Sequence, residues 1–223
     1  MVFAPVRGAV SHVVSATVVE ARLPSSGAAW SVLAERCRQF SGAVRVLVVR
    51  FDPPAVASIG TELSSLSLPD VESSLTALAR PDLVSVAVID AMLQGPALAI
   101  ALGCDLRLCS VDAGLRASAQ ALGSLGRLAD LVGYSRALEL CLTGREVHAA
   151  EAVALGLATV SVNADEVAAV VDDLVAALVA TPRDQAIEMK ATLSTSGIDS
   201  AAARARRVQA ELAAAARLAG EHE

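Results

Sequence analysis

Short apolar runs alternate along this chain with longer stretches in which apolar positions recur at helical spacing. Val44 to Phe51 (VRVLVVRF) is a β-branched run that ends at Asp52-Pro53-Pro54, which predicts a buried strand. Ala28 to Phe40 predicts a helix with its apolar stripe, including Trp30, turned toward the core. The same alternation predicts strands at Ser11 to Arg22, Ala57 to Leu63 and Ala158 to Val162, and helices at Val71 to Ala79, Leu128 to Val132, Ser135 to Leu142, Ala149 to Leu155, Ala164 to Ala180 and Arg183 to Leu218.

The stretch from Ser85 to Asp112 holds the most informative pattern. A short strand stops at Asp90, Gly95-Pro96 opens a helix of small residues that ends at Gly103, and Leu106 to Cys109 alternates like a second strand. A helix start beside a glycine turn directs backbone N–H groups and the positive helix end at a ligand's negative charge. A plain βαβ crossover in the core explains the same pattern, so both interpretations stay open. Ala113 to Gly126 has little periodicity and predicts a loop.

The composition supports an α/β fold, and the net charge disfavours one class of binding partner. Hydrophobic residues make up 54% of the chain but aromatics only 2%, so alanine, valine and leucine must fill the core between close helices and buried parallel strands. The net charge of −6 argues against nucleic acid. No linker-like composition or repeat divides the sequence, which predicts one domain, with a core over residues 1–162 and C-terminal helices over 163–223.

Neither a membrane span, a signal peptide nor a metal site is expected. Asp90, Gly95 and Pro96 interrupt the most apolar window, and Pro5 and Arg7 interrupt the N-terminal one. The four cysteines form no CxxC pair and have no histidine nearby, which fits buried thiols in a reducing cytosol rather than zinc or disulfides. We therefore expect a soluble, cytoplasmic protein.

Several motifs together resemble the crotonase (enoyl-CoA hydratase/isomerase) superfamily. The most specific is Leu142-Thr143-Gly144 through Ala149, Glu151-Ala152 and Gly156-Leu157 to Val160, similar to the family's LTG-x4-A-x-EA-x3-GL-x2-V. It follows Leu131-Val132-Gly133 and Arg136 to Leu140, which match LVG-x-x-RALEL. Cys104 to Arg107 with Asp112-Ala113 resembles CD[IL]R…DA, and Ser58 to Leu63 resembles S-x-GAD[LI].

The resemblance implies a crotonase-like spiral of ββα units with a helical C-terminal part, assembled as a homotrimer or hexamer. It also implies an acyl-CoA thioester as ligand, with no further cofactor. In this family two backbone N–H groups hold the thioester oxygen, and such donors commonly contribute about 3–4 kcal/mol each to transition-state stabilisation. The matching positions here are Thr61 and Pro96. Proline has no N–H, so Ala97 is the alternative second donor. The expected substrate-binding residues are Ile59, Gly60, Thr61, Gly95, Pro96 and Ala97.

The family's two catalytic glutamates are replaced by Ala99 and Ala119, which can neither activate water nor deliver a proton. The remaining polar residues nearby are expected to be solvated or capping groups: Glu62, Gln94, Gln120, Ser124, Arg127 and Asp130. Three functions stay open. The first is a protein that binds an acyl-CoA or acyl-carrier thioester without ordinary hydratase activity. The second is a non-catalytic auxiliary subunit of a biosynthetic or fatty-acid enzyme complex, and the third is an isomerase or lyase with a relocated catalytic group.

The C-terminal part predicts assembly. Arg183 to Leu218 has apolar residues at helical spacing and contains the alanine-rich run from Ala210 to Ala219. A single chain of this length cannot bury that much small apolar surface well by itself. Because the family places its C-terminal helices against neighbouring subunits, we expect these helices in the interface of a trimer or larger assembly. A solvated helix is the alternative.

Overall fold

The computed structural model describes residues 11–40, 42–52, 67–117 and 125–196, together with 210 and 213. Its main feature is a six-stranded sheet in the order β1-β2-β3-β4-β6-β9. From β2 onward every neighbouring pair is parallel, and only β1 runs antiparallel, to β2. The strands are β1 (Ser11–Ser15), β2 (Val18–Leu23), β3 (Val46–Phe51), β4 (Val84–Ile89), β6 (Leu106–Ser110) and β9 (Val160–Val162).

A second, three-stranded sheet follows the carboxyl ends of β4 and β6, because these strands lead directly into its first two strands. It has the order β5-β7-β8, made of β5 (Met92–Gln94), β7 (Gly114–Arg116) and β8 (Glu146–His148). In each strand the middle residue is buried, so Leu93, Leu115 and Val147 form an apolar row in register across the sheet. Glycine at position 114 allows β8 to approach closely, because a Cβ there would lie 3.0 Å from the Val147 carbonyl oxygen and 2.8 Å from the Cε of Met92.

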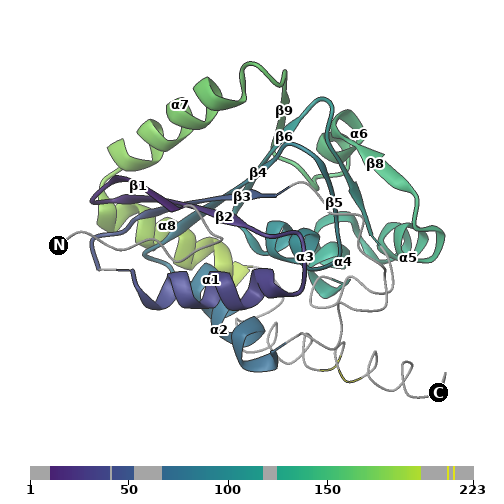
Figure 1. Cartoon of the computed structure of the whole chain (residues 1–223), viewed down its shortest axis with the longest axis horizontal. Helices are drawn as coiled ribbons and strands as arrows, with labels where there is room; N and C mark the ends of the chain where they lie inside the picture. The colour runs from purple at the N-terminus through teal and green to yellow at the C-terminus, as the bar shows by residue number, and fades with distance from the viewer. Residues whose placement is uncertain are drawn as a thin grey trace.

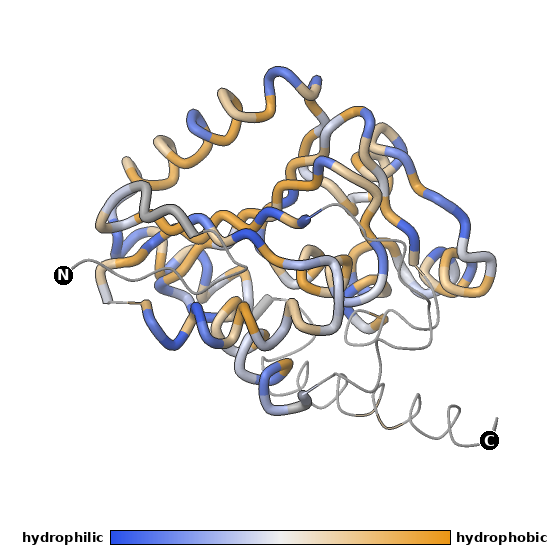
Figure 2. The backbone as a smooth tube through the Cα atoms, in the orientation of Figure 1, coloured by the Kyte–Doolittle hydropathy of each residue, from blue (hydrophilic) through white to orange (hydrophobic). Residues whose placement is uncertain are grey.

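Helices cover both faces of the large sheet (Figure 1). One face packs with α1 (Ala28–Arg38), α2 (Leu68–Leu78) and α3 (Gly95–Gly103) in a core that includes Trp30, fully buried as predicted. The opposite face presents valines of β2, β3 and β4 to α7 (Val167–Ala180). Two-sided burial explains the continuous valine and leucine runs of these strands, visible as the orange centre of the molecule in Figure 2.

Three short helices surround the small sheet: α4 (Leu125–Val132), α5 (Tyr134–Thr143) and α6 (Ala149–Ala154). Gly133 separates α4 from α5 with a φ of 80°, and Gly156 follows α6 with a φ of 78°, so both use a conformation that favours glycine. His148 occupies the N-cap position of α6, yet its side chain makes no capping hydrogen bond.

The C-terminal part is helical, as the sequence indicates, over its described length. After α7 the chain crosses the amino ends of β3 and β4 to α8 (Arg183–Ser196), where Leu178, Ile187, Val46 and Val84 line a small cavity. Ala210 and Ala213 are helical and exposed, and the rest of the run from Ala210 to Ala219 lies outside the described residues. Within the described part of the chain, no helix is both long and apolar enough to cross a membrane.

Two sequence predictions of secondary structure are wrong in detail. The run Ser11 to Arg22 is two antiparallel strands, because Ala16 and Thr17 form a turn in which the Thr17 N–H donates to the Ser15 Oγ over 3.3 Å. The continuous valines on either side conceal that turn. The predicted loop from Ala113 to Gly126 contains β7, which is too short for periodicity to reveal.

Candidate functional site

The turn into α3 is the candidate site, and Gly95 sets its shape. β5 ends at Gln94, and Gly95 begins α3 with a φ of 54°, a left-handed value that glycine adopts without steric cost. The first turn of a helix leaves its N–H groups without intrahelical acceptors. At this helix start those groups belong to Gly95 and Ala97, because Pro96 between them has no N–H.

The turn lies inside the protein. Gly95, Pro96 and Ala97 are all buried, and the whole helix up to Leu102 is buried on every side. Buried donors are partly desolvated, so a hydrogen bond formed there is stronger than one formed in water. The arrangement can hold one carbonyl oxygen at Ala97, and Gly95 offers the nearest second N–H along the same turn.

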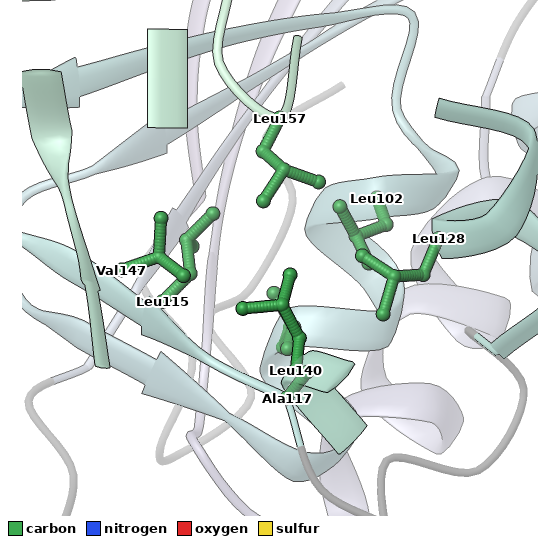
Figure 3. A pocket seen from close by; sticks show the side chains of 8 residues that line it. Leu102, Leu115, Ala117, Leu128, Leu140, Val147 and Leu157 are labelled. Carbon is green, nitrogen blue, oxygen red and sulfur yellow. The ribbon is translucent and has the colours of Figure 1, made fainter. Parts of the chain in front are cut away.

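Ala99 lies one turn into α3 and is only 1% exposed. It packs in the main apolar core, where a methyl group has no means of accepting or donating a proton. Leu98, its neighbour, lines an apolar cavity of about 10 Å³. Figure 3 shows hydrocarbon side chains from the small sheet, from α3, α4 and α5, and from Leu157 meeting around it. None of the eight lining residues has a side chain that could act as an acid or a base.

The polar residues of the Cys104 to Arg107 motif serve the fold. Asp105 Oδ2 accepts hydrogen bonds from the backbone N–H and the hydroxyl of Ser85, each at 2.8 Å. Arg107, 5% exposed, donates to the carbonyl oxygens of Leu157 and Cys104 at 2.6 and 2.7 Å. Burial, and to a lesser extent Arg127, lowers the pKa of Arg107. These residues hold β6, the strand that follows α3. They contribute no side chain to the first turn of α3, where the available polar groups belong to the backbone.

The other predicted site positions divide into two groups. Ile59, Gly60, Thr61 and Ala119 lie outside the described residues, as do Glu62, Gln120 and Ser124. Of the rest, Gln94 and Asp130 are exposed, and Arg127 donates from Nε to the Leu102 carbonyl oxygen at 3.2 Å. Arg127 therefore contacts the far end of α3, away from the turn.

No group of three or more His, Cys, Asp or Glu side chains comes together among the described residues in a way that could hold a metal ion. The buried thiols do not offer an alternative nucleophile. Desolvation raises the pKa of Cys104 to about 12 and that of Cys109 to about 11. Thiols with such pKa values remain protonated at neutral pH.

Sequence reasoning did not foresee that β5 and β7 pair. Gln94 lies opposite Arg116, so the chain leading to Ala119 starts beside the strand that enters α3. The available signal was an apolar residue next to a polar or charged one: Leu93 before Gln94, Leu115 before Arg116, and Val147 between Glu146 and His148.

A parallel sheet covered by helices, a small second sheet and a buried helix that begins at a glycine turn define a crotonase-type α/β protein. The chain belongs to the enoyl-CoA hydratase/isomerase family, whose model matches residues 56–217, well over half of its length.

Curated relatives resemble part of this chain. It is 34% identical over 141 residues to the "Probable enoyl-CoA hydratase 2, mitochondrial" of Arabidopsis thaliana, a match that covers 55% of this chain and 46% of the relative. Over 102 residues it is 37% identical to the probable enoyl-CoA hydratase echA12 of Mycobacterium leprae, covering 43% and 35%. The chain thus spans about half, or less, of the length of these relatives.

Solved structures match the whole fold. A Thermobifida fusca protein described as a putative enoyl-CoA hydratase in complex with CoA is 30% identical, with a TM-score of 0.71 and coverage of 96% of this chain and 94% of that one. An enoyl-CoA hydratase from Mycobacterium avium subsp. paratuberculosis reaches a TM-score of 0.78 at 23% identity, covering 94% and 90%. The second likeness shows the fold alone.

Proposed function

We propose that this protein binds a coenzyme A thioester, or the same acyl group on a carrier, without ordinary hydratase activity. The observation that carries the proposal is Ala99, buried at 1% exposure on the helix whose first turn contains Pro96. A hydratase needs a group that activates water, and neither residue supplies one. The Thermobifida fusca structure in complex with CoA supports a CoA ligand for this fold.

In this proposal the thioester oxygen accepts a hydrogen bond from the Ala97 N–H, and Thr61 supplies the second donor. Gly95 and Pro96 shape the turn, and Ile59 and Gly60 are the remaining proposed substrate-binding residues. The helix end adds a favourable field for the developing charge on that oxygen. The coenzyme A thioester is the ligand, and no further cofactor is proposed.

The test combines binding with turnover. Calorimetry with butyryl-CoA should show saturable binding, and crotonyl-CoA should bind without hydration. General acid and base groups each contribute about 10²–10⁴-fold, so turnover should be at least ~10⁴-fold below that of a hydratase with both glutamates. Hydration close to that of such an enzyme would refute the proposal, as would the absence of heat with either ligand.

Gly95→Ala should weaken binding, because a Cβ at a φ of 54° strains the turn. Gly42→Ala is the matched control, since a Cβ at Gly42 would meet no atom within 4 Å. Equal loss of affinity in both variants would mean that the turn into α3 is not the binding site.

A non-catalytic auxiliary subunit is the second candidate, favoured by an exposed apolar stripe on α5. Tyr134, Leu138 and Leu142 follow one another at intervals of four residues and are 75%, 42% and 76% exposed. Contiguous exposed apolar surface is typical of protein contacts. Copurification of a stable heteromeric complex, together with no heat from any acyl-CoA, would favour this function. No observation on the described residues favours the third candidate, an isomerase or lyase with a relocated acid or base.

We further propose that the protein assembles as a trimer or hexamer in the cytosol. Met189 and Leu193 on α8 are 47% and 71% exposed, so apolar surface is available on a C-terminal helix. The thiols of Cys37, Cys104 and Cys109 are buried and unpaired, which suits a reducing compartment. Light scattering that reports a stable monomer at micromolar concentration would contradict the assembly.

A further inference from the structure

The protein's only lysine fastens α8 to the core. Lys190 Nζ donates to the carbonyl oxygens of Leu78 and Leu83 at 2.9 and 2.5 Å and to Asp105 Oδ2 at 2.7 Å. An ammonium group has three donors, and here each has an acceptor. The acceptors lie at the end of α2, before β4 and before β6, so one side chain joins α8 to three elements.

Apolar packing contributes little to the position of α8. Of its side chains over the described positions 183–194, none is buried. Ala186 and Ile187 face a cavity of about 10 Å³, and Arg183 lies 3.6 Å from Asp82, which Arg80 already holds at 2.7 Å. Lys190, with a side chain only 12% exposed, therefore attaches α8 to the core through three hydrogen bonds.

Asp105 links this attachment to the candidate site. It directly follows Cys104, whose N–H closes the last turn of α3 on the carbonyl oxygens of Ile100 and Ala101. α3 is buried from Gly95 to Leu102 and forms one continuous helix about 13 Å long. Its first turn holds Gly95 and Ala97, and its last turn leads into the carboxylate that Lys190 binds.

We propose that the ion pair between Lys190 and Asp105 acts as a latch, a contact that holds α8 on the core and can open. We also propose that the closed latch, through α3, positions the turn at Gly95–Ala97. Opening the latch frees α8 and lets α3 shift along its axis, which displaces the Ala97 N–H. A ligand at that N–H holds α3 in place and keeps the latch closed. The coupling to α3 rests on the proposed function, whereas the latch itself does not.

Because Lys190 is the only lysine, its acetylation by N-hydroxysuccinimidyl acetate, located by peptide mass spectrometry, measures latch opening. Gln39→Lys, at an exposed position at the end of α1 and away from the proposed subunit interface, supplies a reference lysine in the same molecule. We expect Lys190 to react at least about 10-fold more slowly than the reference, since it reacts only from the open state. Rates within twofold of each other would overturn the latch.

Asp105→Asn should raise the Lys190 rate about 10-fold by weakening a charge-assisted hydrogen bond. Asp82→Asn is the matched control, because it removes the carboxylate that pairs with Arg183 of α8. Equal acceleration in both variants would overturn the special role of Asp105. If Asp105→Asn fails to fold by circular dichroism, Lys190→Met in its place should free α8, detected as faster tryptic cleavage at Arg183 than in Asp82→Asn.

Saturating butyryl-CoA should slow Lys190 acetylation at least about threefold without changing the reference lysine. By thermodynamic reciprocity, a variant whose latch cannot close, Lys190→Met, should bind butyryl-CoA more weakly by a similar factor. An unchanged Lys190 rate while calorimetry shows binding would overturn the coupling. If calorimetry shows no binding, the proposed function is refuted and the coupling with it. The ratio of the acetylation rates of Lys190 and the reference lysine would still show whether the latch exists.

Discussion

The guanidinium of Arg107 reaches from β6 to the carbonyl oxygen of Leu157, 2.6 Å away and 50 residues later in the chain. It thereby ties the central sheet to the segment between α6 and β9. A second bond to the Cys104 carbonyl oxygen and a backbone bond from Arg107 to the Thr159 hydroxyl at 3.2 Å complete the junction.

Arg107→Met should lower the free energy of unfolding by about 2–4 kcal/mol, because two buried carbonyl groups lose a charged donor. Urea denaturation followed by circular dichroism measures the change. Arg116→Met, at an exposed arginine paired with Glu146, is the control and should cost less than about 1 kcal/mol. Similar losses at both positions would contradict the structural role of Arg107.

Pro96→Ala restores a backbone N–H in the first turn of α3 and should tighten butyryl-CoA binding about three- to tenfold, as one hydrogen bond adds about 0.5–1.5 kcal/mol. Pro69→Ala makes the same change at the second residue of α2 and should leave affinity unchanged. Calorimetry compares the two variants. Equal or weaker binding by Pro96→Ala would show that the missing donor does not limit affinity.

The buried thiols predict a loss of stability at alkaline pH. Burial raises the pKa of Cys37 and Cys109 from 9.0 to about 11 and that of Cys104 to about 12. A raised folded-state pKa contributes stability that is present below pH 9 and is lost as the pH rises toward 11 to 12. The urea midpoint should therefore fall between pH 8 and pH 10.5, and by less in Cys104→Ala.

At pH 8 a disulfide reagent should modify the partly buried Cys141 first, and the three buried thiols only after denaturation. Rapid reaction of all four in the native protein would contradict the burial of these side chains.

Assembly through the C-terminal helices predicts that Leu193→Glu shifts the protein toward monomer, because a charge replaces an apolar side chain that is 71% exposed in the single chain. Leu142→Glu changes a side chain of similar exposure, 76%, on α5 and should leave the oligomer intact. Light scattering at several concentrations separates the outcomes. Dissociation by Leu142→Glu alone would place the interface on α5.

The parts of the fold that the sequence predicts well are those buried on both sides. β3 and β4 consist mostly of apolar residues because helices cover both faces of the sheet. The strands at Val44 to Phe51 and up to Asp90 could therefore be predicted from the sequence alone. The small sheet escaped prediction because each strand has three residues, of which β5 and β8 bury only the middle one. Three residues give no measurable period.

The environment of the candidate site was less accessible to sequence reasoning. A helix start at Gly95-Pro96 follows from glycine and proline chemistry, and Ala99 follows from the resemblance. The contact between Lys190 and Asp105 joins residues 85 positions apart, and an isolated lysine in a helix gives no sign of a buried partner. Such long-range polar contacts depend on the packed structure and leave no local pattern.

Because Trp30 is buried, its fluorescence can report on the unfolding of the protein without an added label. The single tryptophan is wholly excluded from solvent, and its indole N–H meets no acceptor among the described residues, so its emission should resemble that of indole in hydrocarbon. The single tyrosine, Tyr134, is 75% exposed on α5. A red shift on denaturation therefore reports when water first enters the layer between α1 and the sheet, while quenching of tyrosine emission by a soluble quencher follows the surface of α5.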